Sequence, residues 1–206
     1  MLFRSDVLLG LAVAARAVGA REAVVYLKGS FEGSERALRS ALAERPLGEL
    51  AVEIKRGEDS YVAGEETALI RSVEGMMGEP RQRPPFPVEK GIDGRPTAIN
   101  NVETWANIPV IISGGGAHFA RVGTKRNTGT KIFSLAGKIR NTGLVEVPMG
   151  MTIEEIITEI GGGPVNQARV KAVQTGGPSG GCIPAQMFHL PIDYESLANA
   201  GSIMGS

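Results

Sequence analysis

The sequence predicts an α/β layered domain followed by a smaller module of hairpin, helix and strand. In the first fifty positions, apolar residues alternate between helical spacing and short β-rich runs, which indicates helix, strand, helix, strand. After residue 130 the pattern changes to two alternating runs joined by a turn, with one amphipathic helix and one more strand behind them. We therefore place a domain boundary near residue 128, between a first domain at 1–127 and a second at 128–190.

Periodicity and end signals assign the first four elements. Residues 5–19 carry apolar side chains at helical spacing, and Gly19 is the expected stop. Residues 23–27 are a short aliphatic run typical of a buried parallel strand. A second amphipathic helix is expected at 32–44 and a second strand at 50–54. Alternation of this kind is typical of half an α/β domain.

Residues 57–101 are expected to be mostly irregular. A Gly-Glu-Glu turn at 64–66 opens a short helix. Residues 79–87 contain four prolines and form an extended arm, because proline lacks an amide hydrogen and fixes φ. Residues 91–101 are a loop, and the helix expected at 102–113 stops at three consecutive glycines.

The second domain has its own series of elements. They are a strand at 131–137, a turn at 141–143, a strand at 144–147, a helix at 153–160 capped by Thr152, a strand at 170–174 and a glycine-rich loop at 175–182. Hairpin, helix and strand within about fifty residues outline a small β-grasp module.

Composition excludes several classes of protein. The 22 Lys and Arg residues balance 22 Asp and Glu residues, so the chain lacks the basic surface that nucleic-acid binding requires. The most apolar stretch, residues 7–18, contains Arg16 and is too short for a bilayer helix. One Cys and two His residues make neither an internal disulfide nor a zinc site, so no metal site is expected. Because no signal peptide is evident, we expect a cytoplasmic protein.

The most distinctive local feature is the Gly64-Glu65-Glu66 turn beside Tyr61. Glycine lets a ligand approach the backbone, a helix N-terminus offers free amides, and carboxylates accept hydrogen bonds from ribityl or ribose hydroxyls. The alternative is an acidic first turn that complements the helix dipole. The pattern alone leaves both open.

Other candidates also have two interpretations. Phe86, between prolines, is either a platform for a planar ring or a plug that packs the arm. Asn100 and Asn101 either bind a ligand or cap the next helix. Cys182 has no adjacent His or Lys to lower its pKa, which favours a passive side chain. Neither standard nucleotide fingerprint is present.

Five motifs in order resemble the NADH-binding flavoprotein subunit of respiratory complex I and its soluble relatives. The motifs are residues 61–75, 84–87, 96–104, 136–138 and 174–182. Residues 173–184 and 190–197 are most similar to the β subunits of NAD(P)-reducing or electron-bifurcating FeFe hydrogenases. The resemblance covers nearly the whole chain.

The resemblance implies the C-terminal part of an FMN- and NAD(P)H-binding α/β domain, a soluble-ligand-binding (SLBB) β-grasp domain and, at 191–206, the start of a linker to a helical domain with a 4Fe–4S cluster. It implies cofactor-binding roles for Tyr61, Gly64, Glu65, Glu66, Phe86, Asn100, Asn101 and Thr104. Phe86 would stack on the adenine. Glu66 would be the catalytic residue that orients the nicotinamide or shares protons.

The family's phosphate-binding glycine loop and cluster cysteines are missing, and Ala63 stands where relatives often have Cys, so we expect an internal fragment. The intact protein would transfer a hydride from NAD(P)H to FMN and pass electrons to iron–sulfur clusters. Its partners would be iron–sulfur subunits of a complex that is peripheral to a membrane. The alternatives are a non-catalytic ligand-binding or docking module centred on 130–190, and a structural subunit with a decayed site.

Overall fold

The structure is a computed structural model that describes residues 4–177 and 180–204. The chain divides into two compact units, Met1–Ser113 and Gly114–Ser206. Pro178 and Ser179 of the predicted glycine-rich loop lie outside the described residues.

A parallel strand pair forms the centre of the first unit. Strand β1 (Glu22–Lys28) pairs with β2 (Ala51–Gly57), and helix α2 (Glu32–Glu44) connects them. Helix α1 (Arg4–Val18) precedes β1, and α3 (Glu66–Val73) follows β2. The predicted order of elements is confirmed. Strand β2 continues three residues beyond the predicted end, because the polar residues Lys55 and Arg56 keep pairing with β1.

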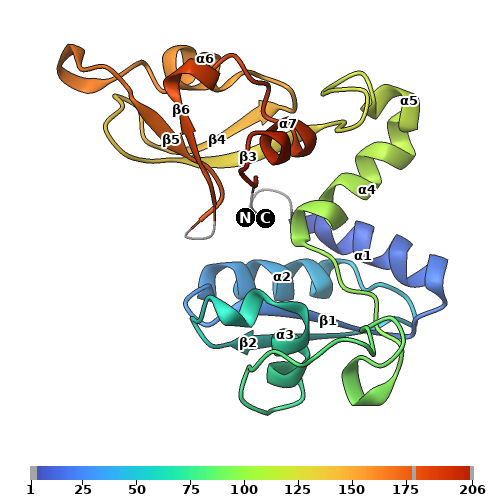
Figure 1. Ribbon diagram of the computed structural model, residues 1–206. Coiled ribbons are helices and arrows are strands. Elements are labelled where there is room, and N and C mark those ends of the chain that lie inside the picture. The colour runs from blue at the N-terminus through green and yellow to red at the C-terminus, as the bar shows by residue number, and fades with distance from the viewer. Residues whose placement is uncertain (1–3, 178–179, 205–206) are drawn as a thin grey trace. The chain divides into compact units, whose positions relative to one another are not determined.

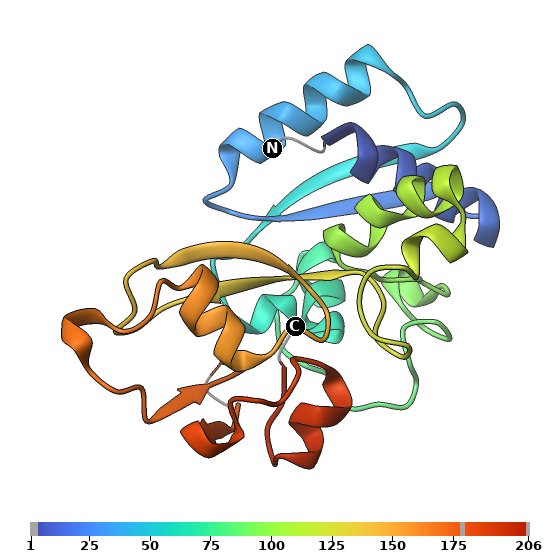
Figure 2. The ribbon, with the colours of Figure 1, turned by 90° about the horizontal axis from the view of Figure 1, so that it is seen from above.

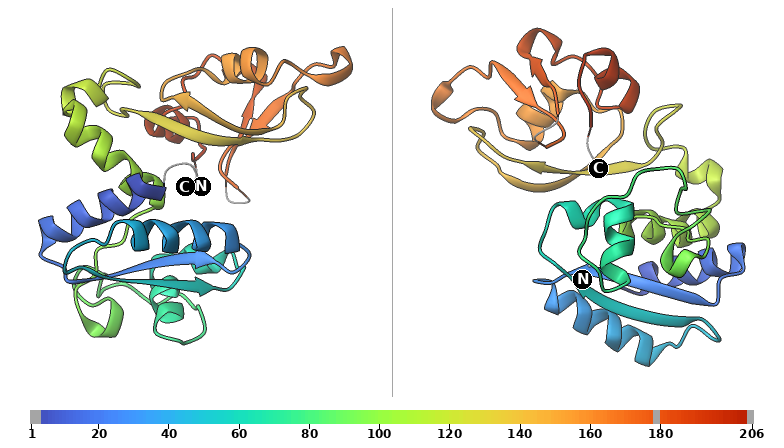
Figure 3. Two further views of the ribbon diagram at one scale, coloured as in Figure 1. Left: turned by 180° about the vertical axis from the view of Figure 1, so that it is seen from behind. Right: turned by 60° about the horizontal axis from the view of Figure 1, so that its bottom comes forward.

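Helices cover both faces of this sheet (Figure 1). Val25, Leu27 and Ile54 alternate onto one face, where they pack with Leu8 of α1 and Leu38 of α2. On the opposite face, α3 is held by two polar contacts. The Tyr26 hydroxyl lies 2.9 Å from Ser72 Oγ, and Lys55 Nζ donates to the Val73 carbonyl at 2.7 Å. Figure 3 shows α2 and α3 on opposite sides of the strands.

Helix α4 (Val102–Gly114) crosses α1 at one very close point. A Cβ on Gly10 would lie 1.8 Å from the Trp105 carbonyl oxygen, so only glycine allows this approach. Pro109 lies four residues after Trp105 and has no amide hydrogen to donate to that carbonyl. The carbonyl is therefore free to face the glycine.

The second unit consists mainly of two antiparallel strand pairs and short helices. Its elements are α5 (Gly116–Phe119), β3 (Thr130–Leu135), β4 (Gly143–Pro148), α6 (Ile153–Glu155), β5 (Ala172–Gln174), β6 (Cys182–Pro184) and α7 (Tyr194–Asn199). Strand β3 pairs with β4, and β5 pairs with β6. The predicted hairpin is confirmed, but its connection is longer than a tight turn because Leu135 pairs with Gly143. Figure 2 shows this curved hairpin.

The core of the second unit is aliphatic. Its fully buried side chains are Val147, Ile153, Ile183 and Leu197, from β4, α6, β6 and α7. Residues 191–206, expected as the start of a linker, supply Ile192, Leu197 and Met204 to this core.

Several elements of the second unit differ from the prediction. The predicted helix at 153–160 starts at the Thr152–Glu155 capping box, but Ile156–Ile160 forms a wider, π-helical turn. There the Gly161 amide donates to the Ile156 carbonyl at 2.8 Å. Strand β5 is shorter than predicted: its pairing with β6 runs only from Ala172–Pro184 to Gln174–Cys182, although the Ala185 amide still donates to the Lys171 carbonyl at 2.9 Å. One helical turn, α5, was not predicted after α4.

Within the described residues, none of the helices combines the length and the hydropathy needed to cross a bilayer.

Candidate functional site

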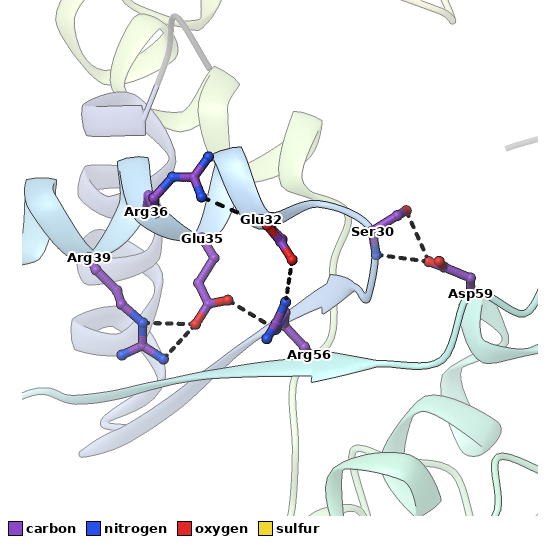
Figure 4. Close-up of polar contacts among 7 residues, drawn as sticks. All are labelled: Ser30, Glu32, Glu35, Arg36, Arg39, Arg56 and Asp59. Carbon is purple, nitrogen blue, oxygen red and sulfur yellow. Dashed lines mark hydrogen bonds and ion pairs between the residues drawn. The ribbon is translucent and has the colours of Figure 1, made fainter.

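The carboxyl ends of β1 and β2 come together in a polar contact, which Figure 4 shows. Asp59 Oδ1 accepts hydrogen bonds from the backbone amide and the hydroxyl of Ser30, each at 3.1 Å. The Ser30 amide, helped by its hydroxyl and by the charge of Lys28, holds the pKa of the Asp59 carboxyl below its usual range. Ligands of open parallel sheets bind outside the carboxyl ends of the strands. The loop that carries Tyr61, Gly64 and Glu65 begins at this edge.

A surface ion network beside that edge joins α2 to β2 (Figure 4). Arg56 Nε lies 3.1 Å from Glu35 Oε2, and its Nη1 lies 3.5 Å from Glu32 Oε1. Arg39 also binds Glu35, at 2.8 Å. Exposed pairs of this kind contribute little individually, but a network holds the crossover helix against its strand.

The loop after β2 presents Tyr61 and Gly64 to solvent. Tyr61 precedes the short helical turn Val62–Gly64, and its side chain is 88% exposed. A Cβ on Gly64 would meet no atom within 4 Å, so there is free space above this backbone. Both residues are therefore accessible to a ligand.

Glu65 caps helix α3. Its Oε2 accepts hydrogen bonds from the Thr67 and Ala68 amides, at 3.0 and 2.9 Å, and from the Thr67 hydroxyl at 2.5 Å. Partial burial alone would raise the pKa of Glu65, but these hydrogen bonds and the charge of Arg83 hold it below its usual range. Helix capping therefore accounts for one carboxylate oxygen, and Oε1 lies 4.0 Å from Arg83 Nη2.

This cap makes the stability of the first unit depend on pH. Ionised Glu65 stabilises the folded state above about pH 4.3, and this stabilisation is lost as the pH falls through the lowered folded-state pKa. We expect Glu65→Gln to reduce the free energy of unfolding by about 1 kcal/mol at neutral pH and by progressively less below about pH 4.3. Urea denaturation across this range measures the difference. Glu58→Gln, at an exposed side chain, is the control and should show no such trend. A constant difference for Glu65→Gln would contradict the assignment.

Glu66 begins α3, and its carboxylate pairs with the proline-rich arm. Arg83 Nη1 donates to Glu66 Oε1 at 2.5 Å, and Arg83 Nη2 lies 4.0 Å from Glu65 Oε1. One arginine therefore links both carboxylates of the predicted site to residues that lie 17 positions further along the chain.

Phe86 lies on the same arm, three residues after Arg83. Its amide donates to Glu89 Oε2 at 3.0 Å, and its carbonyl accepts from the Glu89 and Lys90 amides. Phe86 is 49% exposed, so the residue is accessible to a planar ligand.

The polar residues at the start of α4 are free to bind a ligand. Asn100, Asn101 and Thr104 are solvent-exposed, and their side chains make no hydrogen bond within the described residues. Capping by the Asn101 side chain is thus not observed, although the Asn101 carbonyl accepts from the Trp105 amide. No hydrogen bond or ion pair within residues 4–113 joins these three side chains to Glu66 or Phe86.

The first unit contains cavities near parts of the predicted site. One of about 210 Å3 lies beneath the arm and is lined by Thr67, Ile70, Arg81, Gln82, Pro85, Pro87 and Lys90. Another, of about 720 Å3, is lined by residues of α1, β1, α3 and α4 and by the loop before α4, including Asn100. Neither lining includes Tyr61, Gly64 or Glu66.

The free groups at this site suit part of a flavin mononucleotide. An isoalloxazine ring and a ribityl chain need amide, hydroxyl and carboxylate partners and a close approach to backbone. Asn100, Asn101, Tyr61 and Thr104 supply exposed amides and hydroxyls, and Gly64 supplies open backbone. The residue types present therefore match the partners that the ring and the ribityl chain need.

Sequence patterns did not identify Arg83 and Thr67 as part of the site. Thr67 is 3% exposed, and its hydroxyl donates to Glu65 and accepts from the Arg81 amide at 2.7 Å. A Glu-x-Thr spacing at a helix start was the available signal for Thr67. Arg83 stands in an irregular segment, so its partner could not be inferred from spacing.

Two family models match the chain, in the order that the sequence predicted. Residues 2–110 match the Nuo51 FMN-binding domain, and residues 132–183 match the SLBB domain. The predicted resemblance and fold class are thereby confirmed.

The named relatives of this chain agree with the two family models. The chain is 46% identical over 213 residues to the NADP-reducing hydrogenase subunit HndC of Solidesulfovibrio fructosivorans, covering 98% of this chain and 44% of that protein. It is 42% identical over 209 residues to an NADH-quinone oxidoreductase subunit of Rhizobium meliloti, covering 96% of this chain and 50% of that protein. The chain spans about half the length of these curated relatives.

A solved structure is also similar. The crystal structure of an NAD+-reducing NiFe hydrogenase in the H2-reduced state matches with a TM-score of 0.84 and 36% identity, over 98% of this chain and 36% of that one. Since the Nuo51 model covers more than half of the residues, the chain belongs to the Nuo51 FMN-binding domain family.

Proposed function

We propose that the protein is the flavoprotein subunit of an NAD(P)H dehydrogenase. FMN, when bound, would accept a hydride from NAD(P)H and release electrons singly to iron–sulfur clusters. The observation that carries the proposal is the pair of carboxylates, Glu65 and Glu66, on the loop that leaves the carboxyl edge of a parallel sheet in a chain of this family. Its alternative is a non-catalytic SLBB docking module at residues 130–190.

The residues would have distinct roles. Tyr61, Gly64, Asn100, Asn101 and Thr104 would contact the flavin, and the Phe86 ring would stack on the adenine. Glu65 would mainly keep the N-terminus of α3 in place, because one of its oxygens caps that helix. Glu66 would orient the nicotinamide or share protons beside the flavin, and is the proposed catalytic residue.

The surrounding assembly is part of the same proposal. Residues 1–127 would form part of the FMN- and NAD(P)H-binding domain, and 128–190 the SLBB-type domain. Residues 191–206 would pack on that domain and begin the linker to a 4Fe–4S domain of the full-length protein. The subunit would act in the cytoplasm with iron–sulfur subunits of a multisubunit redox complex, in the manner that the relatives' names as subunits suggest.

The test is electron transfer from NAD(P)H to ferricyanide by the full-length protein. We expect Glu66→Gln to lower kcat/KM about tenfold, since it removes one charge-assisted interaction with the substrate. Glu49→Gln, at an exposed carboxylate of the same unit, is the control and should have wild-type activity. Unchanged activity of Glu66→Gln would refute the catalytic assignment and favour the docking alternative.

A further inference from the structure

The arm, residues 79–87, is attached to the first turn of α3 by three contacts. The Arg81 amide donates to Thr67 Oγ1 at 2.7 Å. Arg83 Nη1 donates to Glu66 Oε1 at 2.5 Å, and Arg83 Nη2 lies 4.0 Å from Glu65 Oε1. Thr67 Oγ1 itself donates to the capping oxygen of Glu65. Backbone and side chain of the arm therefore hold the same helix turn that carries the two carboxylates.

Arg83 is the arm side chain that contacts these carboxylates within the described part of the chain. Its side chain is 44% exposed and that of Glu66 is 36% exposed. A pair with this exposure is screened by water and contributes little to folding stability. Its geometry, however, places a cation between the arm and the proposed catalytic carboxylate.

A stiff segment connects Arg83 to Phe86, so the position of Arg83 constrains the position of Phe86. Only Pro84 and Pro85 separate the two residues, and each proline fixes its own φ. On its other side, Phe86 is held by hydrogen bonds to Glu89 and Lys90. The Phe86 backbone is thus fixed from both directions, and on the N-terminal side Arg83 supplies the attachment nearest to Phe86, with the Arg81 amide two residues further back.

We propose that Arg83 is a positioning residue that holds the Phe86 ring at a set distance from the Glu66 carboxylate, and so determines the affinity for the dinucleotide. This inference rests on the proposed function, in which Phe86 contacts the adenine and Glu66 the nicotinamide. Binding both ends of one ligand requires that the two contacts keep a constant separation. Without the ion pair, the Arg81 amide still holds the arm, but the segment from Gln82 to Phe86 loses its side-chain attachment and the ligand must order more of it, which weakens binding.

Steady-state kinetics of the full-length protein test this role. We expect Arg83→Gln to raise KM for NAD(P)H about threefold to fivefold and to leave kcat unchanged, the pattern of lost binding without lost chemistry. Arg83→Lys retains the positive charge, so its KM should lie between that of Arg83→Gln and that of the wild type. The proposal would be overturned if Arg83→Gln had the KM of the wild type, or if it lowered kcat at constant KM. It would also be overturned if the KM of Arg83→Lys were as high as that of Arg83→Gln.

Arg95→Gln is the matched control. Arg95 also lies near two carboxylates, Glu22 and Asp93, each at 3.5 Å, but it is outside the arm. Replacing Arg95 by glutamine should leave KM for NAD(P)H unchanged.

A ligand-free measurement separates this inference from the proposed function. Hydrogen exchange at the Arg81 and Phe86 amides should become faster in Arg83→Gln and stay at the wild-type rate in Arg95→Gln. Unaltered exchange in Arg83→Gln would overturn the positioning role even where NAD(P)H is oxidised. Conversely, absent NAD(P)H oxidation in the wild type would refute the proposed function whatever the exchange rates are.

Discussion

Replacing Gly10 by alanine should reduce the stability of the first unit by about 3 kcal/mol. The added methyl group would lie 1.8 Å from the Trp105 carbonyl oxygen and 2.7 Å from its carbon. Both are backbone atoms, so neither can swing aside as a flexible side chain would. Helices α1 and α4 must separate, and the packing around Gly10 is lost. Urea denaturation followed by the fluorescence of Trp105, the single tryptophan, measures the change.

Gly33→Ala is the control for this substitution. Gly33 also lies inside a helix, α2, but its added Cβ would meet no atom within 4 Å. Because alanine has the higher helix propensity, this variant should gain up to about 1 kcal/mol. We therefore expect Gly10→Ala to lower the free energy of unfolding and Gly33→Ala to raise it. A stability equal to that of the wild type for Gly10→Ala would show that the close helix crossing is not formed.

Leu197→Ala should destabilise the second unit by roughly 2–5 kcal/mol. Leu197 is 0% exposed and packs in one cluster with Val147, Ile153 and Ile183. Truncation removes apolar contacts and leaves a cavity that the short elements around it can only partly close. Hydrogen exchange at the amides of β3 and β4 reports the loss locally.

Leu144→Ala is the comparison, because that leucine is 77% exposed and lies on the same unit. Its substitution should change stability by less than about 0.5 kcal/mol. If Leu197→Ala were equally neutral, residues 191–204 would not be part of the second core.

Most of the first unit could be predicted from local patterns. The ends of α2 match the prediction, and α1 and β1 match within about one residue, because these elements combine strong periodicity with clear end signals. Strand β2 was predicted too short, since the pairing of Lys55 and Arg56 depends on β1, a segment nearly thirty residues away. The π-helical turn at Ile156–Ile160 also escaped prediction, because isoleucine spacing alone does not distinguish it from an α-helix.

The candidate site was predictable as a set of residues but not as an arrangement. Glu65 and Glu66 could be identified from the sequence because their signals are local: a helix start, a glycine and two adjacent carboxylates. The contact of Glu66 with Arg83 crosses 17 residues of loop and proline-rich chain, where no periodicity relates one position to another. The free side chains of Asn100 and Asn101 likewise could not be told from caps without the structure.

The Ser30–Asp59 contact at the carboxyl edge of the sheet has a consequence for ligand recognition. Together with the Glu65 cap on α3, it fastens the short loop 58–65 at both of its ends. A loop fastened in this way has little conformational entropy left to lose when a ligand arrives. The exposed Tyr61 ring is then the main part of the loop still to be ordered, so this face of the site is largely preorganised before binding.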